Sequence, residues 1–261
     1  MLSPVRLAAL PSITLTKGDH PSFDQGACAM ELVAFLAGEP HSSAPECACP
    51  VIAEILRSWN DDLPGPDRNR LLKPLLPRVA GSRSSPEVMA IRAWMVIDWL
   101  IRTWTPAWLH AAGWEEEAEA ISRLRGLTNA TTAMHPYSYF EELHGLFHDE
   151  WKYAIRPRLH EAVLRRAFTL TGWSAPEEVF MEVMLEEPEV FFAGEHGVEL
   201  WWPPLIRMAT SIGWDCALTK VGEAAQGAAS PRNAIQEAAM PTAIALQLSF
   251  AALLERMLET R

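Results

Sequence analysis

Sulfur, imidazole and carboxylate side chains are concentrated in residues 18–62. This stretch holds two of the eight histidines of the chain and three of its four cysteines. Thiolates and imidazoles are preferred ligands of zinc and iron, and a cysteine beside a histidine can act as a nucleophile. The sequence therefore predicts that a site, if the chain has one, lies in this segment.

Cys28 is the candidate nucleophile, because it falls in the first turns of a predicted helix that also carries Glu31. The positive end of a helix dipole favours the thiolate form of a cysteine. His196, at the head of a predicted short strand, would supply the general base. Cys28 also shares one helical stripe with Leu32 and Phe35, so the sulfur is equally able to pack in the core. Packing in the core is the favoured interpretation, and the other two roles, nucleophile and metal ligand, stay open.

A metal centre is the second hypothesis for the same segment. Its candidate ligands are His20, His41, Cys47 and Cys49. These ligand types suit zinc or iron, which are therefore the possible cofactors. The Cys-x-Cys spacing is closer than the usual zinc knuckle and has no matching second pair, so the spacing itself argues against such a centre.

A further pair of metal ligands is predicted on a helix over residues 137–155. His144 and His148 are four residues apart and so lie on one helical face, with Glu141 one turn earlier. Gly145 stands where a zinc-protease helix needs its glutamate. The favoured interpretation is a solvated, charged helix face.

Helix start signals recur along the chain, whereas alternating strand patterns are nearly absent. The sequence therefore predicts an all-α, multi-helix bundle with at most minor peripheral β structure. We expect a helical half at 1–126, in which residues 18–62 form a cap, and a second half at 127–261. The predicted helices include 25–37, a second helix that begins at 46 or 50 and ends at 60, 137–155, 205–211, 215–224 and 241–260, and the predicted strands are 13–16 and 196–202.

Tryptophans crowd into the first half of the chain, at positions 94, 99, 104, 108 and 114. Aromatic side chains at helical spacing usually fill a core. An apolar ligand pocket or a groove for a partner is the alternative interpretation.

The formal net charge of −11 argues against direct binding to nucleic acid or to anionic lipid, because both carry the same sign. It suits a basic protein partner, and an acidic surface that mimics DNA is an alternative. The first residues lack the long apolar run of a secretory signal, and the longest apolar segment, 90–109, is interrupted by charges. We therefore expect a cytoplasmic protein with reduced thiols and no membrane contact.

One long motif is distinctive. It reads G-x-H-x-S-x-x-x-G-x-C-A-M-E at 18–31, then L-A-G-E-P-H-S at 36–42, P-V-I at 50–52 and R-S-W-N-D at 57–61. This run resembles a group of uncharacterised bacterial and phage proteins, and the resemblance extends over about half of the chain. It implies that the segment is a recurring structural unit, but it carries no activity with it.

Taken together, these patterns lack a complete catalytic constellation. The sequence predicts a non-catalytic binding or regulatory protein that acts through protein contacts, and the resemblance suggests a relation to phage proteins. The alternative is a metal-binding protein or a cysteine-dependent enzyme with its site around Cys28, His20 and His41. The two hypotheses differ in whether these side chains meet in a water-accessible pocket or are dispersed into the core and the surface.

Overall fold

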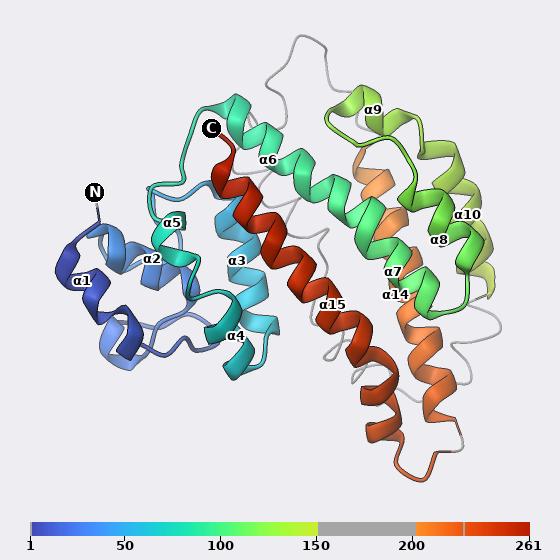
Figure 1. Cartoon of the computed structure of the whole chain (residues 1–261), viewed down its shortest axis with the longest axis horizontal. Coiled ribbons are helices and arrows are strands. Elements are labelled where there is room, and N and C mark those ends of the chain that lie inside the picture. Colours follow the sequence, from blue (N-terminus) through green and yellow to red (C-terminus); the bar gives the residue numbers. More distant parts are fainter. Residues whose placement is uncertain (1, 151–201, 227) are drawn as a thin grey trace. The chain divides into compact units, whose positions relative to one another are not determined.

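The computed structural model describes residues 2–150, 202–226 and 228–261. Within these residues every named element is a helix, and the only β pairing is an isolated parallel bridge between Leu15 and Ala27. The predicted all-α class is confirmed (Figure 1). The segment 13–16, predicted as a short strand, contributes only that bridge.

Contacts divide the chain into two compact units. Among the described residues, unit one comprises 2–93 and 251–261, and unit two comprises 94–150, 202–226 and 228–250. The boundaries fall inside helices α6 (Pro86–Trp99) and α15 (Pro231–Glu259), so each of these helices contributes to both units. The units differ from the halves 1–126 and 127–261, which stay a prediction.

Unit one contains the sulfur- and imidazole-rich segment. Helix α2 packs against α3 and α5 over buried residues that include Leu32, Ile52 and Trp59. Before α6, its elements are α1 (Pro4–Ala9), η1 (Leu10–Ser12), η2 (Phe23–Gln25), α2 (Ala29–Ala37), α3 (Pro50–Asp62), α4 (Gly65–Leu71) and α5 (Leu76–Val79).

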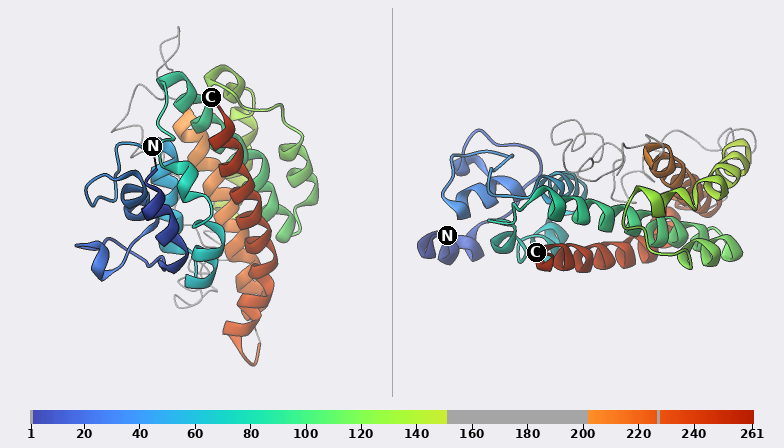
Figure 2. Two further views of the ribbon diagram at one scale, coloured as in Figure 1. Left: turned by 60° about the vertical axis from the view of Figure 1, so that its left-hand side comes forward. Right: turned by 90° about the horizontal axis from the view of Figure 1, so that it is seen from above.

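Unit two is organised around the long helix α14, which packs against both α7 and α10 (Figures 1 and 2). Its elements besides α6 and α15 are the π-helical turn η3 (Leu100–Trp104), α7 (Thr105–Ala111), α8 (Glu115–Ser122), α9 (Ala130–Met134), α10 (Tyr137–Glu150) and α14 (Trp202–Ala225). Trp94, Trp99, Trp104 and Trp108 are buried, which confirms their predicted place in the core, whereas Trp114 is only half-buried.

Three helix boundaries differ from the prediction. Helix α2 begins at Ala29 and not at residue 25, because Gly26 has a φ of 133° that no helix accommodates. Helix α14 runs through Gly213 without a break, and a Cβ at that position would overlap the ring of Trp104. Helix α15 begins at Pro231, so that Pro241 lies within it. The alanine-rich turns before Pro241 have high helix propensity and continue the helix despite the lost hydrogen bond.

Residues Asn233–Glu259, which belong to α15, form the one described helix that is long and apolar enough to cross a membrane by length and composition. Of its most apolar window, 33% is buried. The core helices of soluble proteins pass the same test, so this finding is weak evidence. The expected cytoplasmic location stays a prediction.

Candidate functional site

The candidate site is built at the N-terminus of α2, where Cys28 is the N-cap residue. The backbone N–H of Glu31 donates to the Cys28 sulfur at 3.5 Å, and the Glu31 carboxylate accepts from the Cys28 N–H at 2.8 Å. This reciprocal pair is a capping box in which cysteine takes the place of the usual serine or threonine. The run C-A-M-E therefore starts the helix, and Cys28 lies just before its first turn.

The Glu31 carboxylate is buried, and His20 contacts both of its oxygens. The backbone N–H of His20 donates to Oε1 at 2.7 Å, and its ring Nδ1 lies 2.8 Å from Oε2. On the other side of the ring, Nε2 is 2.9 Å from the hydroxyl of Thr16. Nδ1 faces a carboxylate and so carries a proton, which fixes the orientation of the imidazole.

His41 supplies the last contact to this carboxylate. Its Nε2 donates to the carbonyl of His20 at 2.6 Å and lies 3.5 Å from Oε1 of Glu31. The ring also packs edge-on against Phe23, with centroids 4.5 Å apart. Glu31 thus accepts three hydrogen bonds, and His41 Nε2 makes a further contact at 3.5 Å.

Burial alone would raise the pKa of Glu31. The N–H groups of Cys28 and His20, together with the His20 ring, outweigh burial and hold this pKa below its usual range. The side chain is therefore an anion at neutral pH whose charge is balanced by hydrogen bonds inside the fold.

Cys28 has the opposite electrostatic character. Its residue is 3% exposed, and burial raises its pKa to about 12. The nearby Glu31 charge raises it further, while the N–H that the sulfur accepts acts in the lowering direction. At neutral pH the sulfur is a neutral thiol, which is a poor nucleophile.

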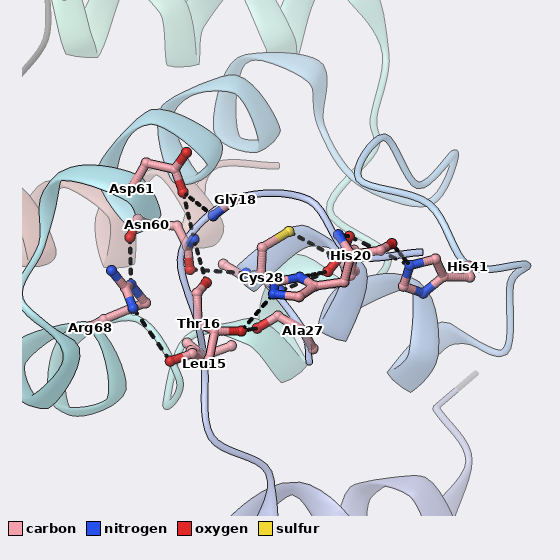
Figure 3. A network of polar contacts seen from close by, with 12 residues as sticks. Leu15, Thr16, Gly18, His20, Ala27, Cys28, His41, Asn60, Asp61 and Arg68 are labelled. Carbon is pink, nitrogen blue, oxygen red and sulfur yellow. Dashed lines mark hydrogen bonds and ion pairs between the residues drawn. The ribbon is translucent and has the colours of Figure 1, made fainter. Parts of the chain in front are cut away.

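Asn60, at the C-terminal end of α3, joins the same region from a distant part of the chain (Figure 3). Its side-chain oxygen Oδ1 accepts from the backbone N–H of Ala29 at 3.1 Å, and its side-chain nitrogen Nδ2 donates to the backbone carbonyl of Thr16 at 2.9 Å. Asp61 accepts from the Asn60 amide at 3.0 Å and from the N–H of Gly18 at 2.8 Å. These contacts fix the loop before His20 to the start of α2 and to the end of α3.

Arg68 on α4 completes the network, and the side chain is buried. Its guanidinium donates to three carbonyls, those of Asn60 at 2.5 Å, Leu63 at 2.8 Å and Leu15 at 3.4 Å. Two of these carbonyls lie at the end of α3, where helical partners are missing. We call the set formed by Thr16, Gly18, His20, Cys28, Glu31, His41, Asn60, Asp61 and Arg68 the Glu31 cluster.

Gly26 is required at its position for two reasons. Its φ of 133° lies in a region that side chains rarely adopt, and a Cβ there would come within 2.7 Å of the His20 ring nitrogen Nε2. The imidazole therefore lies directly against the backbone of the turn that leads into α2.

The structure brings together four of the predicted site residues, His20, Cys28, Glu31 and His41. Among the described residues, the one group of three potential metal ligands consists of Asp19, Cys28 and Glu31, whose ligand atoms lie within 4.8 Å of one another. Asp19 was not among the predicted ligands, because an exposed aspartate beside a histidine has no distinguishing spacing.

Cys47 and Cys49 belong to no such group among the residues that were described. Cys49 is the buried N-cap residue of α3, and its N–H donates to the hydroxyl of Ser82 at 2.9 Å. The N–H of Cys47 donates to Glu39 at 2.9 Å, and burial raises the pKa of its thiol. Both cysteines therefore help to form the turn that begins α3.

Three predicted site residues remain: the possible ligands His144 and His148 and the possible base His196. His144 lies on α10 and is half-buried. His148 is on the same helix, but its side chain lies outside the described residues, as does His196 altogether. The proposed pairing of Cys28 with His196 stays a prediction.

Comparisons of the chain with protein-family models, with curated proteins and with solved structures found no match. The resemblance of residues 18–61 to bacterial and phage proteins accordingly stays a prediction. The geometry of the site has to carry the functional argument.

Replacing Glu31 by glutamine should lower the free energy of unfolding by about 2–3 kcal/mol at neutral pH, because a charged acceptor of several buried N–H groups is lost. The pKa of Glu31 is lower in the folded state, so its stabilisation is present above its unfolded pKa of about 4.3 and is lost as the pH falls through the folded pKa. The difference between wild type and Glu31→Gln should therefore shrink below about pH 4. Urea denaturation of both proteins at a series of pH values measures this difference in the free energy of unfolding.

Glu119→Gln is the control for this experiment. It removes the same charge from an exposed ion pair with Arg123 and should change stability by less than about 0.5 kcal/mol. A Glu31→Gln chain as stable as the wild type at neutral pH would show that the buried carboxylate does not support the fold.

Proposed function

We propose that this chain is a non-catalytic binding or regulatory protein that acts through protein contacts. One observation carries the proposal: the reactive residue types of the N-terminal segment are engaged in holding the fold. The Glu31 carboxylate accepts hydrogen bonds from His20 and Cys28, the His41 ring lies 3.5 Å from it, and the Cys28 sulfur is buried.

A cysteine hydrolase needs a thiolate that substrate can reach, with a base that takes its proton. Cys28 has a pKa of about 12 and faces the negative charge of Glu31. Of the two nitrogens of His20, one faces Glu31 and the other the Thr16 hydroxyl, so this imidazole already has two partners. These features support a structural role over a catalytic one.

A protein is the expected class of partner. The net charge of −11 disfavours nucleic acid and anionic membranes and favours association with a basic protein surface. Ile244 and Leu248, one turn apart on α15, are 43% and 50% exposed and offer apolar contact area. A regulatory role and the suggested relation to phage proteins belong to the same proposal.

The test compares the tagged full-length chain with its Cys28→Ser variant, which keeps an acceptor at the N-cap and removes the thiol. We expect both proteins to recover the same partner protein from cells in stoichiometric amounts. In native protein, iodoacetamide should modify the half-buried Cys47 before Cys28, which should react only after unfolding in urea. Peptide mass spectrometry measures the order of labelling.

The opposite result has a clear form. Rapid labelling of Cys28 in the folded chain, together with turnover of a small molecule that Cys28→Ser abolishes, would establish a cysteine-dependent enzyme. Recovery of no partner by either protein would also count against the proposal.

Metal binding is a second candidate function, favoured by the grouping of Asp19, Cys28 and Glu31 within 4.8 Å. A thiolate with two carboxylates suits zinc or iron. The oxygens of Glu31 already accept hydrogen bonds, so an ion would have to displace at least one donor. This cost is the reason that protein contacts are the leading proposal.

Cobalt(II) titration tests the metal hypothesis, because a cobalt–thiolate bond gives a charge-transfer band in the near ultraviolet. If the chain binds metal here, the band should saturate at one equivalent, and it should be absent in Cys28→Ser and weaker in Asp19→Asn. Elemental analysis of protein purified without a polyhistidine tag gives an independent readout. Absence of both the band and a stoichiometric metal would eliminate this candidate.

A further inference from the structure

Helices α7 and α8 border an open cleft in unit two with a volume of about 650 Å³. Small-molecule pockets typically have volumes of about 300–1,000 Å³. Most of its lining is apolar, and Pro106, Ala107 and Ala118 contribute to it. The two helices lie side by side in Figure 1.

One wall of the cleft is formed by the π-helical turn η3, a distortion that is frequent at functional sites. Arg102 on this turn is fixed in place, because its Nε donates to Asp98 at 2.8 Å and its Nη1 donates to the carbonyl of Leu124 at 2.6 Å. The charge of Arg102 is compensated by Asp98, so this side chain contributes a fixed part of the cleft lining.

The α8 side of the cleft carries carboxylates. Glu115 contacts His110, and Glu119 pairs with Arg123 at 3.0 Å. Glu116 also lines the cleft and has no ion pair among the described residues. Acidic side chains in the first turn stabilise a helix through its dipole. That role does not explain why apolar surface lies beside the acids of α8.

We propose that this cleft binds a basic segment of a partner protein. The aliphatic stem of a lysine or arginine would lie on the apolar lining, as such stems commonly do, and its cation would face Glu116. The net charge of −11 attracts the same kind of partner from a distance. This inference rests on the proposed function, that the chain acts through protein contacts, and names the chemistry of the partner.

The probe is a short fluorescein-labelled peptide of alternating lysine and alanine, with a glutamate–alanine peptide for comparison. Fluorescence anisotropy with the full chain should detect binding of the lysine peptide that weakens with added salt. Glu116→Gln should weaken binding about fivefold and Glu116→Lys by more than about tenfold. Glu142→Gln, which removes the same charge from an exposed site on α10, should leave binding unchanged. Circular dichroism checks that each variant is folded.

Three results with the peptides would overturn the inference: no binding of the lysine peptide, equal weakening by Glu116→Gln and Glu142→Gln, or preference for the glutamate peptide. Equal weakening would mean that only the overall charge attracts the peptide. The broader proposal fails separately. A partner recovered from cells that binds the Glu116→Lys chain as tightly as the wild type would refute the cleft and leave the protein-contact function standing.

Discussion

The buried carboxylate of Glu31 is the constraint on which the N-terminal part of the structure depends. Burying a charge is costly unless hydrogen bonds replace the lost water. Here the replacement donors are the backbone and ring of His20 and the N–H of the N-cap Cys28, and the ring of His41 lies 3.5 Å from the same carboxylate. None of these segments can move without leaving part of the charge unsatisfied. The loop before α2, the start of that helix and the loop after it are therefore held as one body.

The same arrangement gives the reactive residue types of this segment partners inside the fold. Paired donors and acceptors rigidify a structure, whereas catalysis needs groups that are free to exchange partners with substrate. Among the described residues of this cluster, the buried Nδ1 of His41 has no hydrogen-bond partner. The cleft between α7 and α8 has the converse character, since Glu116 is exposed and unpaired among the described residues. The residues with the most suggestive chemistry thus support the fold, and an ordinary surface carboxylate is the better candidate for recognition.

Local signals predicted much of this structure from the sequence. The predicted helix start at residue 137 agrees with the first residue of α10, and the burial of Trp99, Trp104 and Trp108 agrees with their helical spacing. The start of α2 differs from the predicted residue 25 because its capping box uses cysteine in place of serine or threonine and because Gly26 has a positive φ. Helix α14 was divided at Gly213 because glycine usually interrupts helices, whereas here it makes room for Trp104.

The site was predicted only in part, for a physical reason. His20, Cys28 and Glu31 are close in sequence, so their convergence followed from local structure. Asn60 and Arg68 reach the same place from tens of residues away through contacts with backbone carbonyls and N–H groups. Backbone partners leave no pattern in the sequence, and long-range packing alone determines which of them meet.

Hydrogen exchange of the His20 and Cys28 backbone N–H groups, followed by nuclear magnetic resonance, tests the central claim most directly. Both groups donate to Glu31, and we predict that in the wild type they exchange as slowly as the core of α2. Exchange should be at least about tenfold faster when Glu31 is replaced by glutamine. Exchange in the wild type at the rate of an exposed loop would contradict the account, because the carboxylate would then not be holding these segments together.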